Sequence, residues 1–245
     1  MNPSLLTTFT EHACPVWVCP ACHSKSLTIM RGSFHSETIL ESIARWQRSD
    51  GELEDIELVF CCLLKCDLGR CSTVVAVSGS GYVTDTPWEA REEGESSHTE
   101  LFQALSFIPP LSAFTIPSRC PGHVVDPLRL SFSLFLNVQG AAANAIRIAL
   151  EEMMTALGVA QTGSLYQRIE ALPTQYREYK TALTSMRLLG NAGSHTLDRV
   201  TATDIEQAYT IIEFVLQKIY DGSIESISQL VARLDERFRP ESRSA

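Results

Sequence analysis

Cysteine is the residue type whose spacing in this chain points most directly to chemistry. Seven of the eight cysteines fall into two groups, and only Cys120 lies apart from them. In the first group Cys19 and Cys22 form a knuckle, in which two thiolates on one tight turn can reach the same metal ion. In the second group Cys66 and Cys71 flank a turn-forming tetrapeptide between two expected strands. These two pairs predict one tetrahedral Zn²⁺ site made of four thiolates.

Neighbouring residues keep other interpretations open. Cys14, His12 and His23 are rivals for a ligand position. Cys61 and Cys62 stand in an apolar run, where at least one side chain should face the core. A degenerate or empty metal site would explain the same cysteines, and so would a redox function of their thiols. Since a filled four-thiolate site leaves no position for water or substrate, we expect its Zn²⁺ to be structural and to hold the module together.

Arg187, Asn191 and His195 form a second constellation, because they recur every four residues. On a continuous helix such positions drift by about 40° per step, so the three side chains would lie along one face. An arginine that holds a phosphate, an asparagine that orients it and a histidine that transfers a proton would suit metal-free phosphodiester cleavage. Gly190 and Gly193 lie in the same stretch, and glycine there predicts close approach of another helix or backbone.

The same residues allow a purely structural interpretation. A buried network of arginine, asparagine and histidine, paired with Glu151 or Glu152, would fix helix packing, since buried polar groups are normally paired. Arg147 and Glu151 are four residues apart, so they would either support a catalytic face or form an ordinary salt bridge along one helix. Solvent access at His195 separates the two interpretations.

The elements that must position these residues divide the chain into three parts. Residues 1–106 form a β-rich module, with strand-length segments at 27–34, 56–64 and 72–77 and helical spacing at 36–48. Residues 107–127 hold five prolines, which predict an extended strap anchored by Phe107, Leu111, Phe114 and Ile116. Residues 128–245 have helical spacing over 128–157, 164–172, 174–189, 203–220 and 224–238. We therefore expect an α+β protein, in which an N-terminal zinc-bound β module, ribbon-like in its cysteine pairs, packs on a C-terminal α-helical bundle.

Composition narrows the class of protein. With 44% hydrophobic and 20% charged residues, the chain can bury a sizeable core. A formal net charge of −9 argues against a broad electrostatic footprint on DNA, although a small, locally basic site is compatible with this charge. The apolar runs fall short of the ~20 residues that span a bilayer, and the N-terminus lacks the basic and apolar regions of a signal peptide. These features predict a cytoplasmic protein with no membrane partner, in which clustered cysteines bind metal.

Four segments of the chain carry a family resemblance. They are Cys66–Gly81 (CDLGRCSTVVAVSGSG), the proline strap Ile108–Pro117, Ala141–Glu152 (AAANAIRIALEE) and Arg187–His195 (RLLGNAGSH). Together, and in this order, they resemble the bacterial domain-of-unknown-function 4145 family, from about Cys19 to about Tyr220. Members of that family are similar to HEPN domains, which are helical bundles, often dimeric, found in phage-defence, toxin–antitoxin and restriction systems.

The resemblance implies a function as well as a fold. It implies a HEPN-like helical domain at 128–245 and a protein of prokaryotic antiviral defence or toxin type, acting as a homodimer. Active HEPN ribonucleases carry an arginine, an adjacent polar residue and a histidine, with four to six residues between the arginine and the histidine. This sequence departs from that pattern, because Leu188 takes the polar position and seven residues separate Arg187 from His195. The implied activity is a metal-independent endoribonuclease on RNA. His195 would exchange the proton of an attacking 2′-hydroxyl, while Arg187 and Asn191 would stabilise the developing charge.

A second hypothesis needs no catalysis. The chain would be a non-enzymatic, zinc-stabilised binding or adaptor protein, in which the zinc module and the strap recognise the end of a protein or a nucleic acid. The polar network around Arg187 would then only stiffen the helical bundle. The net negative charge of the chain favours either a protein partner or a narrow binding site. Such a protein partner would be another component of a defence system.

Overall fold

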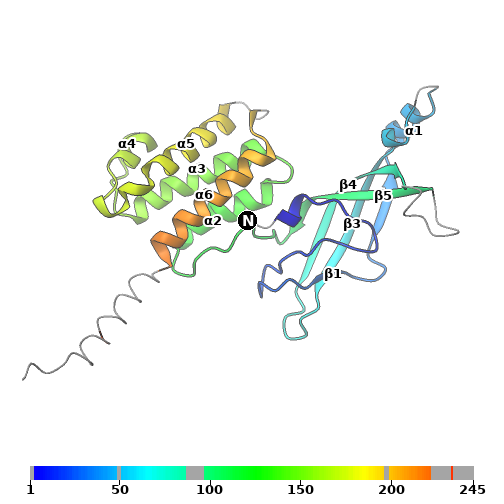
Figure 1. Ribbon diagram of the computed structural model, residues 1–245, viewed down its shortest axis with the longest axis horizontal. Coiled ribbons are helices and arrows are strands. Elements are labelled where there is room, and N and C mark those ends of the chain that lie inside the picture. The colour runs from blue at the N-terminus through cyan, green and yellow to red at the C-terminus, as the bar shows by residue number, and fades with distance from the viewer. Residues whose placement is uncertain (1–2, 49–50, 87–96, 196–198, 222–232, 234–245) are drawn as a thin grey trace, which may run out of the picture.

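The computed structural model describes residues 3–48, 51–86, 97–195, 199–221 and 233. Within them, an antiparallel sheet makes up the N-terminal part and α-helices make up the C-terminal part (Figure 1). The expected α+β class is therefore confirmed. Buried residues of both parts belong to one hydrophobic cluster. No described helix has both the length and the apolar character that crossing a membrane requires.

The sheet of the described residues has five strands, and all pairings are antiparallel. The strands are β1 (Leu27–Ile29), β2 (His35–Thr38), β3 (Glu57–Cys66), β4 (Val74–Asp85) and β5 (His98–Ile108). Their order is β1-β3-β4-β5, and β2 also pairs with β3. Strand β3 alternates between exposed and buried residues along its whole length, so one of its faces lies on the core. It ends at Cys66, and the turn to β4 carries Cys71, which places both cysteines at one end of the sheet.

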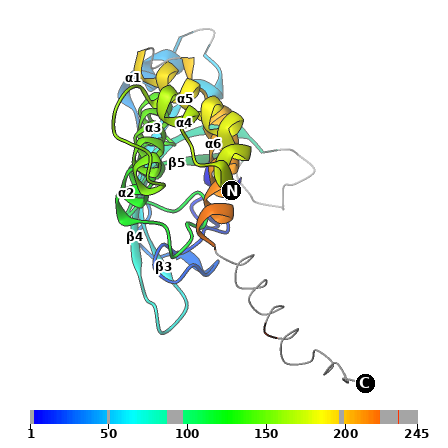
Figure 2. The same cartoon turned by 90° about the vertical axis from the view of Figure 1, so that its left-hand side faces the viewer.

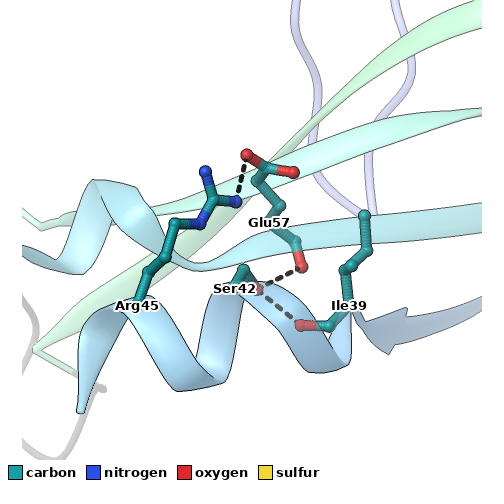
Figure 3. Close-up of polar contacts among 4 residues, drawn as sticks. All are labelled: Ile39, Ser42, Arg45 and Glu57. Carbon is teal, nitrogen blue, oxygen red and sulfur yellow. Dashed lines mark hydrogen bonds and ion pairs between the residues drawn. The ribbon is translucent and has the colours of Figure 1, made fainter. Parts of the chain in front are cut away.

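The helix expected over residues 36–48 is shorter than predicted. Residues His35–Thr38 pair with β3 as strand β2, and helix α1 covers only Leu40–Trp46. Ser42 Oγ donates to the carbonyl oxygens of Ile39 and Glu57, at 2.7 and 3.3 Å, while Arg45 pairs with the Glu57 carboxylate (Figure 3). Pairing with β3 provides hydrogen-bond partners for the backbone of β2, and these side-chain contacts fix α1 beside the start of β3.

Aromatic side chains fill the inner face of the sheet. Trp17 is fully buried and packs edge to face against Phe9 and Phe107, at ring-centroid distances of 5.3 and 5.0 Å. Phe9 also exchanges two backbone hydrogen bonds with Phe102 of β5. The N-terminal segment that leads to Cys19 is thereby fixed on the sheet.

The proline strap is anchored as predicted, but it ends earlier. Leu111 and Phe114 are buried, and Ile116 packs partly buried against the same cluster. Helix α2 (Gly122–Leu134) begins inside the expected strap and contains Pro127 in its second turn, where the missing N–H removes a single helical hydrogen bond. The expectation of one helix over 128–157 is wrong, because the chain leaves the helical conformation before α3 (Gln139–Ala156) begins.

The described helical part contains four further elements. They are α4 (Leu165–Glu170), a 3-10 helix at Thr174–Tyr179, α5 (Lys180–His195) and α6 (Ala202–Tyr220); shorter 3-10 helices lie at Pro3–Leu6 and Leu53–Asp55. Helices α2 and α5 pack on α3, and α5 lies beside α3 in both views (Figures 1 and 2). The expected helix over 224–238 lies outside the described residues, except for Arg233, which is helical.

Candidate metal centre and polar helix face

The sulfur atoms of Cys19, Cys22, Cys66 and Cys71 all lie within 4.8 Å of one another. Cys19 Sγ is 3.7 Å from Cys71 Sγ, and Cys22 Sγ is 3.6 Å from Cys66 Sγ. Zn–S bonds of about 2.3 Å in a tetrahedron place the sulfur atoms about 3.8 Å apart, so these distances fit an S₄ metal site. The four predicted ligands are thus brought together with the spacing that one metal ion requires.

Local backbone geometry builds both halves of this site. The knuckle at Cys19–Cys22 is closed by hydrogen bonds from His23 N to Cys19 O (3.0 Å) and from Cys19 N to Ser24 O (2.8 Å). His23 has a positive φ of 58°, which turns the chain sharply after Cys22. Opposite it, Cys71 N donates to Leu68 O at 2.7 Å and closes the turn after β3. Two tight turns therefore face each other across the sulfur cluster.

Hydroxyl groups next to the sulfur atoms favour thiolates. Ser24 Oγ lies 2.9 Å from Cys22 Sγ, and hydrogen bonding to Ser24 lowers the pKa of the Cys22 thiol to about 6. Ser26 Oγ lies 3.0 Å from Cys66 Sγ and lowers the pKa of that thiol in the same way. Burial raises the pKa of Cys19 to about 11, although the backbone N–H groups of its own turn oppose this shift. A bound cation would deprotonate such a thiol.

The rival ligands lie outside the cluster. Cys14 Sγ donates to a backbone carbonyl of β1 at 3.6 Å, and the His12 ring contacts the carboxylate of Glu11 at 3.1 Å. Cys62 faces the core, as expected for one residue of its pair, and burial raises the pKa of its thiol to about 12. His23 is exposed on the turn that follows the knuckle. Within the described residues, the four cysteines form the one group of at least three metal-ligating side chains that could share an ion.

The glycines of α5 allow this helix to approach α3 closely, as predicted. A Cβ atom on Gly190 would lie 2.5 Å from Arg147 Cβ. A Cβ atom on Gly193 would overlap the carbonyl oxygen of Gly140 and lie 2.8 Å from Ala143 Cβ. Any larger residue at either position would push the two helices apart.

The structure brings only part of the predicted catalytic constellation together. Arg187 is half-buried, with its guanidinium carbon 5.3 Å from the centre of the Tyr166 ring of α4. Asn191 is half-buried on the same helix. Arg147 pairs with Glu151 at 2.8 Å, which is the expected contact between residues four apart on a helix. His195 is the last residue of α5, and its side chain lies outside the described part of the structure.

Two polar contacts on this face were not foreseen from the sequence. Ser194 Oγ contacts Asn144 Oδ1 of α3 at 2.8 Å, and Tyr166 supplies the aromatic ring beside Arg187. Each contact joins residues from different helices, so no spacing pattern within one segment could predict it. Within the described residues, the polar face therefore includes Asn144, Arg147 and Glu151 from α3, Tyr166 from α4, and Arg187, Asn191 and Ser194 from α5.

A cleft lies next to the metal site, between the sheet part and helix α2; we call it the interdomain cleft. Its volume is about 390 Å³, and its lining includes Ala21 and His23 of the knuckle, Pro110 of the strap, and Arg129 and Phe132 of α2. Phe114 and Ile116 of the strap also line it. Two of the four anchors of the strap therefore form part of the cleft as well as part of the core.

Comparison with protein-family models assigns the two parts of the chain separately. Residues 129–237 match the model of a domain of unknown function, DUF4145. This match supports the DUF4145 family for the helical part. Residues 7–107 match a different domain of unknown function, DUF8608. Two segments of the family resemblance, Cys66–Gly81 and Ile108–Pro117, thus lie outside the DUF4145 region, and the resemblance extends less far towards the N-terminus than predicted. No curated protein and no solved structure matches the chain.

Proposed function

We propose that the chain is a binding protein, in which a structural Zn²⁺ ion fixes one wall of a recognition site for the carboxyl-terminal end of a partner protein. The observation that carries this proposal is the position of the interdomain cleft. One wall belongs to the turn that bears Cys19 and Cys22, and the opposite wall belongs to the strap and helix α2. A metal ion held by the four cysteines would order the knuckle, and with it the cleft.

The lining of the interdomain cleft suits an apolar group that ends in a negative charge. Phe114 and Phe132 are buried and pack edge to face at 5.0 Å, which gives a rigid apolar floor. Arg129 is exposed and forms no ion pair with any described residue. A guanidinium binds a carboxylate through two parallel hydrogen bonds. A hydrophobic carboxyl-terminal residue presents both groups in one ligand.

Size and charge favour a peptide end over a nucleic acid. The volume of about 390 Å³ lies within the roughly 300–1,000 Å³ of small-ligand pockets. A net charge of −9 opposes the approach of a polyanion, whereas a single carboxylate needs only one cation. We assign the partner to the same prokaryotic defence setting that the family resemblance implies, in a reducing cytoplasm where thiolates stay available for metal.

A display library of peptides with free carboxyl termini tests this proposal on the purified full chain. Peptides selected on the wild type should lose affinity by about tenfold or more when the carboxyl group is amidated, or when Arg129→Gln removes the cation. Arg31→Gln replaces another exposed arginine, on the sheet part, and should leave affinity unchanged. Equal binding of free and amidated peptides would contradict the proposal, and so would tighter binding of a 5′-phosphorylated oligonucleotide.

A second candidate function is a metal-independent endoribonuclease with a HEPN-like bundle, active as a homodimer. One observation favours it: Arg147 and Arg187, on the packed helices α3 and α5, each have a buried Nε atom that finds no hydrogen-bond partner in the described part of the chain. Two such guanidinium groups could hold a phosphate. In this mechanism a 2′-hydroxyl of RNA attacks the adjacent phosphate, Asn191 orients that phosphate, and His195 takes the proton and returns it to the leaving oxygen.

The ribonuclease candidate is tested with wild type and His195→Ala on total RNA. Cleavage by the wild type that disappears in the variant, at an unchanged melting temperature, assigns His195 to chemistry. Intact RNA with both proteins, together with a loss of stability on the order of 1–3 kcal/mol in the variant, assigns it to packing. Light scattering on the same samples tests the homodimer.

A further inference from the structure

Arg168 is a buried cation in the DUF4145 region. It lies on the short helix α4, and only 9% of its surface is exposed. Among the described residues it is the only charged side chain that is buried to this degree. Arginine is rarely buried without a partner that compensates its charge.

The guanidinium of Arg168 is far from satisfied. Its Nη2 donates to Thr155 Oγ1 of α3 at 2.8 Å. The Thr155 hydroxyl donates in turn to Glu151 O at 3.2 Å, so towards Arg168 it acts only as an acceptor. Arg168 Nε is buried and has no hydrogen-bond partner among the described residues. A guanidinium has five N–H donors, so a single neutral acceptor leaves most of its capacity unused.

No carboxylate of the described chain neutralises this charge. Glu151, on the helix that carries Thr155, pairs with Arg147 at 2.8 Å. Glu170, at the end of α4, pairs with Lys180 at 3.0 Å. These two acids are therefore engaged elsewhere, and Arg168 forms no ion pair with a described residue. An uncompensated buried charge is strongly unfavourable, and an anion from outside the chain would relieve it.

A pocket of about 370 Å³ adjoins Arg168, between the loop that follows α3 and helix α4. Small residues leave this space open: Ala160, Gly163 and Ala171 all line it. Thr162 and Gln167 add polar groups to the lining. Among the described residues, no acidic side chain lines the pocket, and Arg168 is the one cation of the lining.

We propose that this pocket binds a small molecule through a carboxylate group that pairs with Arg168. The planar guanidinium offers two parallel donors to the two oxygens of a carboxylate. A phosphate dianion would need a second cation, and the lining supplies none. Since the lining of this pocket shares no residue with that of the interdomain cleft, the site does not depend on the proposed peptide binding.

Melting temperatures of the full chain in sodium acetate, sodium benzoate, sodium phosphate and sodium chloride, at equal ionic strength, test the carboxylate site. A bound carboxylate should raise the melting temperature saturably, by roughly 3–6 °C at about ten times its dissociation constant. Phosphate should have no effect beyond that of chloride. A larger shift with phosphate would overturn the carboxylate assignment, and equal shifts with all four salts would overturn the site.

Three variants separate binding from a structural role of Arg168. Arg168→Gln should abolish the carboxylate effect without lowering the melting temperature in chloride, because it removes an uncompensated charge. Ala171→Met fills the pocket without changing the charge, so it should also abolish the rise in melting temperature that carboxylates cause. If Arg168→Gln does not fold, Ala171→Met alone tests whether the pocket binds the carboxylate. Arg177→Gln replaces an exposed arginine of the same region and should keep the full effect. A carboxylate effect that survives in both pocket variants would overturn the proposal.

Discussion

The Sγ atoms of Cys22 and Cys66 lie 3.6 Å apart, although 44 positions separate these residues in the sequence. Strand pairing explains this proximity. Strand β1 begins shortly after the knuckle, and its first residue, Leu27, pairs with Cys66 at the end of β3. The register of β1 on β3 thus places the first cysteine pair beside the second, and a metal ion bound there would fix that register in return.

Loss of one ligand should unfold the sheet part. Cys22→Ser removes a thiolate from the cluster, so bound zinc and the β signal in circular dichroism should both be lost, while the helical signal largely persists. Cys61→Ser is the matched control, because Cys61 is exposed on β3 and lies outside the cluster. Its stability should stay within about 0.5 kcal/mol of wild type. Similar melting curves for the two variants would argue against a structural metal.

Close packing of α5 on α3 predicts a large difference between two glycine substitutions. Gly193→Ala places a methyl group against the Gly140 carbonyl and should lower the free energy of unfolding by about 3 kcal/mol. Gly122→Ala, in the first turn of α2, meets no atom within 4 Å and should be neutral or stabilising by up to about 1 kcal/mol. Urea titrations of both variants measure the difference. Equal stability would mean that the helices are not in close contact.

A buried hydroxyl pair should contribute to the stability of the helical part. Ser131 Oγ donates to Ala142 O at 3.0 Å, so the Tyr209 hydroxyl, 2.8 Å away, must donate to Ser131 Oγ. Tyr209→Phe removes this donor from a fully buried site and should cost about 1–2 kcal/mol in denaturant unfolding. Tyr82→Phe, at an exposed position of β4, should cost almost nothing. A neutral Tyr209→Phe would mean that the buried bond is not formed in solution.

Helix α1 offers a comparison between a buried and an exposed contact of the same strand residue, Glu57. Ser42 is fully buried and donates to the Glu57 carbonyl, so Ser42→Ala should cost about 1–2 kcal/mol. Arg45 and Glu57 form an ion pair whose side chains are 45% and 49% exposed, and Arg45→Gln should cost less than about 1 kcal/mol. Thermal unfolding of both variants, in low and in high salt, measures the two losses of stability. A larger loss for Arg45→Gln, sensitive to salt, would reverse this ranking.

Features encoded within one segment could be predicted from the sequence. The Cys19–Cys22 knuckle needs only a tight turn, and Cys66 and Cys71 need only the turn between β3 and β4, so spacing alone identified all four residues. Gly190 and Gly193 likewise revealed a close helix contact, since glycine has few other reasons to lie within a helix. The partners of these glycines on α3 could not be named in advance.

Features that depend on contacts between segments could not be predicted. Strand β2 forms because His35–Thr38 meet β3, although the helix expected over 36–48 includes three of these four residues. Pro127 suggested an extended strap, yet it is accommodated in α2. Arg168 resembled any surface arginine of a short helix, and only the packing of α4 on α3 shows that it is buried without an ion pair. Tertiary packing overrides local propensity in each of these cases.

We propose that four cysteines from two distant segments hold one metal ion and thereby order the sheet part. The most direct test is elemental analysis of the purified full chain, followed by circular dichroism before and after a strong chelator. We predict one zinc ion per chain, and loss of the β signal when the chelator removes it. A chain that contains no metal, and whose sheet melts at the same temperature with and without the chelator, would contradict this account.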